Sequence, residues 1–187
     1  GTSLSKCYGI IERFSEDIDL VYSQENFEFE YKEEYENDEK LGSKKRDKLV
    51  KSLVLEAEKF TLDKFLPAIQ KIIDSDEING IYKLYISEEC ATDLIFEYPS
   101  SIEEESKIQY LRPEIKIECG ARSKMVPSSL AKVKTMLFDV IPSIADKIEE
   151  IQVLNPSRTF WEKAMLLHTS NETNKLPHNG YRISRHI

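Results

Sequence analysis

The chain has 187 residues, of which 40% are hydrophobic, and this is enough to bury one sizeable core in a single folded unit. No long apolar run and no basic leader followed by an apolar stretch is present, so we expect neither a membrane span nor a signal peptide. The 3 cysteines, Cys7, Cys90 and Cys119, are odd in number and lack metal-ligand spacing, which favours a reducing, cytoplasmic location.

The formal net charge of −8 is distributed unevenly. Residues 25–40 carry eight acidic side chains against two lysines, whereas residues 41–60 carry six basic side chains against three acidic ones. Residues 151–187 are also basic, with five positive and two negative side chains. Because the acidity is confined to one segment, the net charge does not exclude an anionic partner such as RNA. The alternative for the basic residues of 44–51 is an ordinary solvated helix face.

The first element in chain order is a short helix after Ser3. Its apolar residues recur at helical spacing, at Leu4, Cys7, Tyr8 and Ile11. The small residues Gly1, Thr2 and Ser3 would then lie at a helix N-terminus, where N–H groups and the helix dipole attract anions. This pattern predicts a triphosphate-binding segment to which Lys6 adds positive charge, although a plain N-cap is the simpler alternative.

A strand follows, with the sequence Asp17-Ile18-Asp19-Leu20. The strand period places the two carboxylates on one face and directs Ile18 and Leu20 to the other, toward a core. Neighbouring carboxylates repel each other, and a bound divalent cation is the usual reason for such a pair. Surface decoration is the alternative, but a small-residue turn, a helix and Asp-x-Asp within about twenty residues favour a metal–nucleotide site.

The middle of the chain predicts further elements. Alternating Phe27, Phe29 and Tyr31 indicate a short strand, followed by a polar loop over residues 33–40. A long helix should begin at Gly42-Ser43 and bury its apolar side, with a second helix over residues 62–74 that is bent near Pro67. Strands are expected at residues 81–87, 93–98 and 114–119, with a solvated acidic loop between the last two.

The C-terminal part is predicted to be mostly helical. Residues 126–150 fit either a helix or, in their first half, an extended segment, and residues 151–154 form a short strand. Asn155-Pro156 is a good helix start. The expected buried stripe of that helix includes a core histidine: Phe160, Trp161, Ala164, Leu167 and His168. Residues 171–180 read as a loop, and neither zinc-ligand spacing of the histidines nor a hydrolase or P-loop pattern is found.

These motifs together resemble a known family. Residues 1–6 and 13–20 are similar to the signature of the AbiEii/AbiGii-type toxin nucleotidyltransferases, within the DNA polymerase β-like superfamily. Three later segments agree with it: residues 110–118, residues 158–164 with Leu167-His168, and residues 182–186. The resemblance implies an α/β (α+β) fold in which a small mixed sheet carries flanking helices. Residues 1–125 would form the nucleotidyltransferase core, and the mostly helical residues 126–187 would close the nucleotide cleft.

The resemblance also implies roles for single residues. Glu118 would supply the third carboxylate, completing with Asp17 and Asp19 a catalytic site for Mg²⁺ or Mn²⁺. Lys163 would be a catalytic residue that contacts the nucleotide, and Gly1, Thr2, Ser3 and Lys6 would bind the phosphates of an NTP. Relatives carry an aspartate after an Arg-His pair, whereas Arg185-His186-Ile187 stops just before that point.

The function implied is metal-dependent transfer of an NMP from an NTP to an acceptor, expected to be RNA at the 3′ end of tRNA. The chain would be the toxin of a toxin–antitoxin or phage-defence system, with a cognate antitoxin as a partner. Two alternatives stay open. One is transfer to a small molecule or a protein hydroxyl, and the other is a non-catalytic module that binds a nucleotide or a partner.

Overall fold

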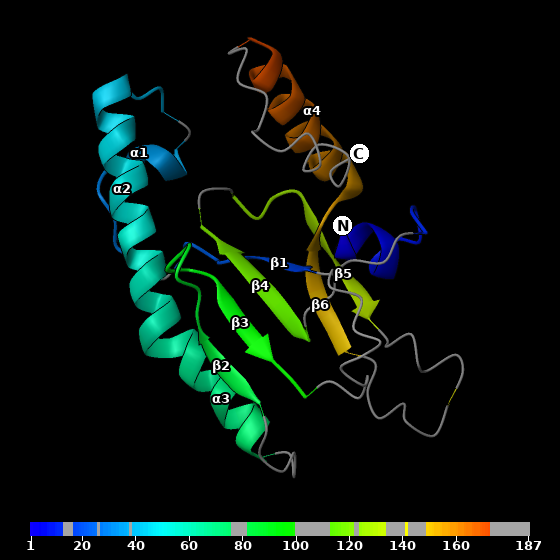
Figure 1. The fold of residues 1–187 in the computed structure, drawn as a ribbon. Helices are drawn as coiled ribbons and strands as arrows, with labels where there is room; N and C mark the ends of the chain where they lie inside the picture. Colours follow the sequence, from blue (N-terminus) through cyan, green and yellow to red (C-terminus); the bar gives the residue numbers. More distant parts are fainter. Residues whose placement is uncertain are drawn as a thin grey trace. The chain divides into compact units, whose positions relative to one another are not determined.

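The computed structural model describes residues 1–12, 17–25, 27–37, 39–75, 82–99, 113–121, 124–133, 141 and 149–172 (Figure 1). The chain divides into two compact units, one formed by Gly1–Ser15 with Met125–Ile187 and the other by Glu16–Lys124. Helices and strands occur in both, which confirms the predicted mixed α/β class. The first fifteen residues therefore fold with the C-terminal part of the chain.

A four-stranded mixed sheet forms the centre of the Glu16–Lys124 unit. Its strands are β1 (Asp17–Val21), β2 (Lys83–Ile86), β3 (Leu94–Glu97) and β4 (Glu114–Gly120), in the order β1-β4-β3-β2. β1 runs parallel to β4, while the β2–β3 and β3–β4 pairs are antiparallel. All four strands were expected from their alternating patterns. The pairing places the Asp-x-Asp strand directly beside the strand of Glu118.

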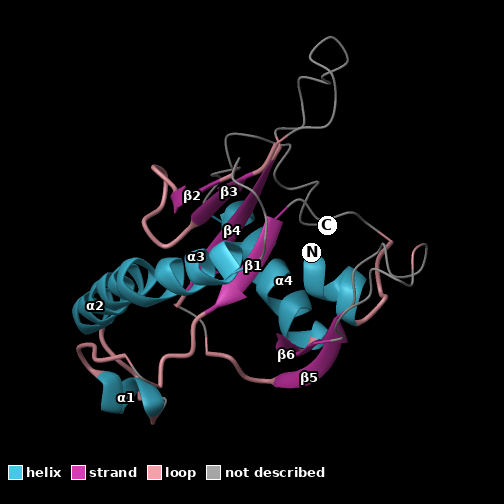
Figure 2. Cartoon of the chain, turned by 90° about the horizontal axis from the view of Figure 1, so that it is seen from below, coloured by secondary structure: helices cyan, strands magenta, loops and turns pink. Residues whose placement is uncertain are grey.

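A long helical segment runs alongside this sheet (Figures 1 and 2). α2 (Ser43–Phe60) continues through the π-helical η2 (Thr61–Phe65) into α3 (Leu66–Ser75). As predicted, α2 buries Leu49, Leu53 and Ala57. Pro67 has no N–H to donate to a carbonyl of the preceding turn, and the wider π turn lies immediately before it. The irregularity expected near Pro67 is thus a local change of helix type.

The core of this unit joins α2 to the ends of β1 and β4. Tyr22, Phe27, Leu53, Ala57, Cys119 and Ala121 are its buried members. The ring of Tyr22 meets those of Phe60 and Phe65 edge-on, with centroids 5.0 and 5.5 Å away. Its hydroxyl pairs with that of Thr61 at 2.8 Å, and Thr61 donates to the carbonyl of Ala57 at 2.9 Å. This hydrogen-bonded aromatic cluster fixes the chain where it leaves β1.

The structure corrects the predictions for residues 27–40. Phe27, Phe29 and Tyr31 form no strand, and α1 (Lys32–Glu36) replaces part of the predicted polar loop. Phe27 is buried in the aromatic core, and Tyr31 has a left-handed backbone conformation with φ of 62°. Lys32 donates to the carbonyl of Phe27 at 2.7 Å. The alternation of aromatic residues reflects packing against α2 and α1, since these residues have no partner strand in the described part of the chain.

The second unit contains a two-stranded sheet. β5 (Ser128–Val133) pairs antiparallel with β6 (Glu149–Leu154), and α4 (Pro156–Glu172) follows β6. Of the two alternatives for residues 126–150, the extended one is therefore correct for the first half, while most of the second half lies outside the described residues. The N-terminal π-helical η1 (Ser3–Cys7) contacts both strands.

The predicted buried stripe of α4 is wrong. Phe160 and Trp161 are 63% and 65% exposed, Leu167 is 43% exposed, and His168 is exposed instead of lying in a core. Ala164 is half-buried, as are the polar residues Thr159, Glu162 and Lys163. Helical spacing identified which residues share a side of α4, but it could not show which side is covered. No described helix is long and apolar enough to cross a bilayer.

Candidate active site

The parallel pairing of β1 with β4 brings the predicted carboxylates to one face of the sheet. Asp17 lies opposite Lys116 and Asp19 lies opposite Glu118. Side chains at paired positions of neighbouring strands point to the same face, and residues two apart on one strand share a face. Asp17, Asp19, Lys116 and Glu118 therefore project from the same side.

The opposite face carries the apolar residues of the two strands. Ile18 pairs with Ile117, and Leu20 pairs with Cys119. Cys119 is buried, but Ile18 and Leu20 remain 37% and 36% exposed. The prediction that both of these β1 side chains face a core is therefore wrong in this structure, where the buried part of the face begins at Cys119 and Tyr22.

Lys116 is a positively charged residue on the sheet face that carries Asp17, Asp19 and Glu118, which we call the carboxylate face. Its ammonium lies 2.9 Å from an oxygen of Glu118 and 3.4 Å from an oxygen of Asp93. Partial burial lowers the pKa of Lys116, but the hydrogen bonds and charges of Glu118 and Asp93 outweigh this effect and raise the pKa overall. Lys116 is therefore fully charged at neutral pH.

Asp93 is a buried carboxylate that sequence reasoning missed. It immediately precedes β3, its residue is 6% exposed, and one of its oxygens accepts the N–H of Cys119 at 3.1 Å. Buried charges are costly unless they are paired and hydrogen-bonded, and Asp93 has both kinds of partner. The sequence offered one signal, the position of Lys116 two residues before Glu118 on the same strand face. Nothing in the sequence marked Asp93 as its partner.

The donor chemistry of this face fits a hard divalent cation. Asp17, Asp19 and Glu118 offer carboxylate oxygens, the ligands that Mg²⁺ and Mn²⁺ prefer. Among the described residues, however, no three acidic, histidine or cysteine side chains converge on one point. Glu118 is turned to Lys116 instead. The residue types and the β1–β4 register suit such a cation. For the three carboxylates to converge on it, Glu118 has to leave Lys116.

The predicted phosphate-binding residues lie in the other unit. Gly1, Thr2 and Ser3 are half-buried at the start of η1, and Lys6 lies in its last turn. The hydroxyl of Ser5 donates to the carbonyls of Gly1 and Thr2 at 3.4 and 3.2 Å. The helix is shorter than predicted, since it ends at Cys7 and Gly9 then takes a left-handed conformation with φ of 60°. Ile11 therefore lies beyond it.

A chain of hydrogen bonds links η1 to the start of α4, which carries the half-buried Lys163. The hydroxyl of Tyr8 lies 3.1 Å from that of Ser129 on β5, and Ser129 donates to the side-chain oxygen of Asn155 at 3.0 Å. Asn155 precedes α4, as the predicted helix start requires, and its carbonyl accepts the N–H of Arg158 at 2.9 Å. The ends of the two helical segments are thus tied through β5.

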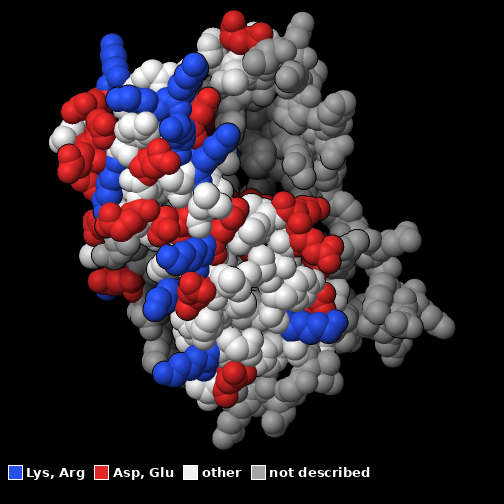
Figure 3. All heavy atoms as spheres, turned by 90° about the vertical axis from the view of Figure 1, so that its left-hand side faces the viewer, with Lys and Arg blue, Asp and Glu red and all other residues white. Residues whose placement is uncertain are grey.

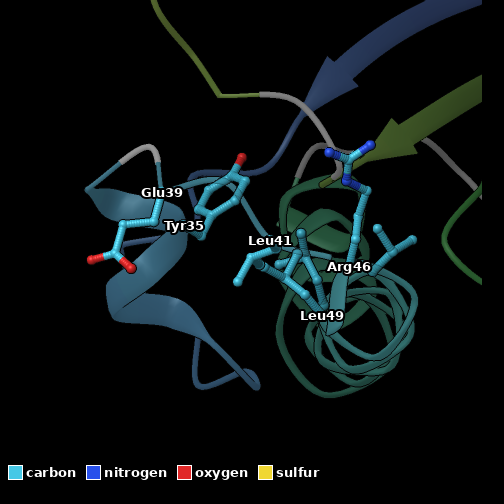
Figure 4. A pocket seen from close by; sticks show the side chains of 7 residues that line it. Tyr35, Glu39, Leu41, Arg46 and Leu49 are labelled. Atoms are coloured by element: carbon cyan, nitrogen blue, oxygen red, sulfur yellow. The ribbon is translucent and has the colours of Figure 1, made fainter. Parts of the chain in front are cut away.

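The acidic segment lies beside the basic helix. Tyr35 and Glu39 line a pocket of about 310 Å³ together with Arg46 and apolar residues of α2 (Figure 4). Lys45 lies over the ring of Tyr31, with 5.2 Å between its nitrogen and the ring centroid. On the face drawn in Figure 3, Lys and Arg side chains gather with Asp and Glu side chains next to them. The N-terminal half of α2 therefore has acidic neighbours and is not an isolated basic surface.

The similarity of the chain to known proteins extends over its whole length. The family model described as "Nucleotidyl transferase AbiEii toxin, Type IV TA system" matches residues 1–187. The chain belongs to this family. The match confirms the resemblance drawn from the motifs and makes the protein an NTP-dependent nucleotidyltransferase of a toxin–antitoxin system, with a cognate antitoxin as the implied partner. No curated protein and no solved structure matches the chain.

Within the AbiEii family, the site residues can be sorted by unit. Asp17, Asp19 and Glu118 belong to the unit of the four-stranded sheet, where they share one face. Gly1, Thr2, Ser3, Lys6 and Lys163 belong to the unit of β5, β6 and α4. His178, His186 and the Arg182–His186 motif lie outside the described residues.

Proposed function

We propose that this AbiEii-family protein transfers an NMP from an NTP to the 3′ hydroxyl of an RNA, with tRNA as the acceptor class. The observation that carries the proposal is the β1–β4 register, which aligns Asp19 with Glu118 beside Asp17 in a chain that matches a nucleotidyltransferase family from end to end. Three carboxylates on one sheet face suit divalent cations, which would stabilise the attacking and leaving oxygens as their charge changes during transfer.

In the proposed reaction the acceptor hydroxyl attacks the α-phosphorus of the NTP. A new P–O bond forms to the acceptor as its hydroxyl proton passes to solvent water, the bond between the α-phosphorus and the bridging oxygen breaks, and pyrophosphate leaves. A bound Mg²⁺ or Mn²⁺ would neutralise the phosphates and lower the pKa of the attacking hydroxyl. Asp17, Asp19 and Glu118 would hold that cation, and their fixed strands would supply alignment.

The remaining predicted site residues would contact the phosphates of the NTP, as the family resemblance implies. Thr2 and Ser3 carry hydroxyls that suit phosphate oxygens, and Gly1 lets the backbone approach them closely. Lys6 and Lys163 supply positive charge. We assign Lys163 the role of stabilising the negative charge that grows in the transition state, and Lys6 the role of binding the NTP in the ground state. Substitutions of the two lysines should therefore differ in kinetic effect.

Radiolabelled NTPs, offered one at a time with Mg²⁺ and total cellular RNA, test the proposal. Label in an RNA band of one size supports RNA as the acceptor, and label on protein or on a small molecule would replace RNA by that acceptor. If NTP binds and no acceptor of any kind is labelled, the protein is a binding module. Lys163→Ala should lower kcat, whereas Lys6→Ala should mainly raise KM, and a kinetically silent Lys163→Ala would contradict the role given to Lys163.

A further inference from the structure

The carboxylate face contains a positive charge that the metal-binding scheme does not use. Lys116 is a strand residue whose ammonium contacts Glu118 on one side and Asp93 on the other, at 2.9 and 3.4 Å. Its backbone is paired with Asp17 across β1 and β4. The lysine thus stands on the same face as the three proposed metal ligands, in register with Asp17 and paired with Glu118.

Repulsion between the carboxylates explains why a positive charge would be needed at this position. Three carboxylates on adjacent strands repel one another whenever no cation is bound, and close pairs of like charge cost folding free energy. An ammonium at 2.9 Å from Glu118 offsets that repulsion. The side chain of Lys116 is 31% exposed and that of Glu118 is 43% exposed, so water reaches the pair and it can separate without leaving a charge in an apolar interior.

Asp93 differs from the other acids because its contacts fix it in place. One oxygen accepts the N–H of Cys119 and the hydroxyl of Thr92, while the other contacts Lys116, and its side chain is 9% exposed. A buried carboxylate with these partners has little freedom to reach a cation on the sheet face. It can, however, retain the ammonium of Lys116 after Glu118 has left it.

This inference rests on the proposed function. We propose that Lys116 is the counter-ion of Glu118 in the metal-free protein and that the incoming divalent cation displaces it. Asp93 is the positioning residue that retains the displaced ammonium. Glu118 then exchanges one cationic partner for another. The exchange makes metal binding weaker than it would be without the competing ammonium, and it couples loading of the metal to a movement of one side chain.

Two substitutions are expected to act in opposite directions on Mn²⁺ affinity without NTP, measured by electron paramagnetic resonance. Lys116→Met keeps the length of the side chain and removes the competing charge, so Mn²⁺ should bind about three- to tenfold tighter. Asp93→Asn keeps an acceptor for the N–H of Cys119 but retains the ammonium less well, so Lys116 should stay on Glu118 and Mn²⁺ should bind about threefold weaker.

Melting temperature gives a second readout that does not depend on activity. Metal-free Lys116→Met should melt below the wild type, and saturating Mn²⁺ should raise its melting temperature by more than that of the wild type. Lys83→Met is the matched control, because Lys83 lies on the edge strand β2, two strands from β4, where its ammonium pairs with Glu97 at 3.1 Å. Its Mn²⁺ affinity should equal that of the wild type.

The outcomes separate this inference from the proposed function. If Glu118→Gln or Asp19→Asn binds Mn²⁺ as tightly as the wild type, the proposed metal site itself is wrong. If those variants lose Mn²⁺ but Lys116→Met leaves the affinity unchanged or lowers it, the counter-ion role is wrong while the metal site stands. Should Lys116→Met weaken NTP binding alone, the lysine is a phosphate ligand and the proposal is overturned.

Discussion

At the scale of single residues, substitutions of the paired carboxylates are expected to affect activity and stability differently. Asp19→Asn removes one of two acids that face each other across β1 and β4, and Glu118→Gln removes the other. Each change should abolish NMP transfer, because the amide is a poor metal ligand. The melting temperature of metal-free Asp19→Asn should hold or rise slightly, since repulsion is relieved. Transfer assays and calorimetry check both, and loss of folding in Asp19→Asn would make this residue structural.

Glu118→Gln needs a separate expectation for stability. Its carboxylate is the partner of Lys116 at 2.9 Å, so the substitution removes an ion pair as well as a repulsion. The two effects oppose each other, and we expect a melting temperature within a few degrees of the wild type. A large fall, with normal folding of Asp19→Asn, would show that the Lys116–Glu118 pair is needed for folding.

The thiol of Cys119 makes stability depend on alkaline pH. Burial raises its pKa to about 11 from the ordinary value of 9.0, and Cys119 is 6% exposed. Because the folded-state pKa is the higher one, the unfolded chain loses its proton first. The stabilising effect is therefore complete below pH 9 and is lost as the pH rises toward 11.

Denaturant titrations at pH 8, 9, 10 and 11 check this pH dependence. The wild type should lose stability over the window from 9 to 11, and Cys119→Ala should lose less. Burial also raises the pKa of the neighbouring Tyr22, so some loss will remain in the variant above pH 10. Cys90→Ala, which changes an exposed cysteine, is the control and should follow the wild type. Parallel curves for wild type and Cys119→Ala would refute the assignment.

At the scale of elements, the contact between β1 and the α2–η2 segment depends on one buried pair of hydroxyls. Thr61 is fully buried, and its hydroxyl joins Tyr22 to the carbonyl of Ala57. Thr61→Val preserves the shape but leaves the Tyr22 hydroxyl without this partner, which should cost about 1–3 kcal/mol of unfolding free energy. The double variant with Tyr22→Phe should recover part of this loss, because both polar groups are then removed.

Urea unfolding of the two single variants and the double variant measures the coupling between Tyr22 and Thr61. Ser52→Ala offers a matched control on α2. The hydroxyl of Ser52 is half-buried, and its bonds lie on the outer part of the helix. Additive losses in the Tyr22–Thr61 cycle would mean that the hydrogen bond contributes nothing to the junction.

Elements with strong periodic patterns could be predicted from the sequence, and those fixed by tertiary contacts could not. The strands of Asp17 and Glu118 and the long helix after Gly42 show regular apolar spacing, and all three exist. Residues 27–31 alternate as a strand would, yet Phe27 is buried in a cluster that includes Phe60 and Leu53 of α2, which are distant in sequence. The ion pair between Lys116 and Asp93 likewise depends on the β3–β4 pairing, which no local pattern specifies.

At the scale of the whole molecule, charge decides how an RNA acceptor would be recognised. Lys44, Lys48 and Lys51 are exposed on α2, away from its buried residues, while Lys45 and Arg46 lie near the acidic segment. Part of the acidic segment therefore lies beside the N-terminal half of the basic helix. Among the basic residues at the start of α2, Lys44, Lys48 and Lys51 are therefore the ones suited to contact RNA phosphates.

Reversing Lys48 and Lys51 to Glu should weaken RNA binding and reduce its salt dependence, because each phosphate that the protein no longer neutralises lowers the log–log slope by about 0.7–0.9. Fluorescence anisotropy with tRNA at several salt concentrations measures both quantities. Reversing Lys132, an exposed lysine of β5 near Glu150, is the control for general charge effects. Transfer that is nearly independent of salt and indifferent to the α2 changes would contradict an RNA acceptor bound through this helix.

The pairing of the first fifteen residues with residues 125–187 has a consequence for synthesis. A ribosome releases η1 long before β5 and β6, the strands that η1 contacts, so η1 cannot pack against this sheet until both strands have been made. The unit of the carboxylates, by contrast, is contiguous and can fold early. We therefore expect nascent chains halted before β6 to protect α2 from protease but not η1, so that the two units form at different stages of synthesis.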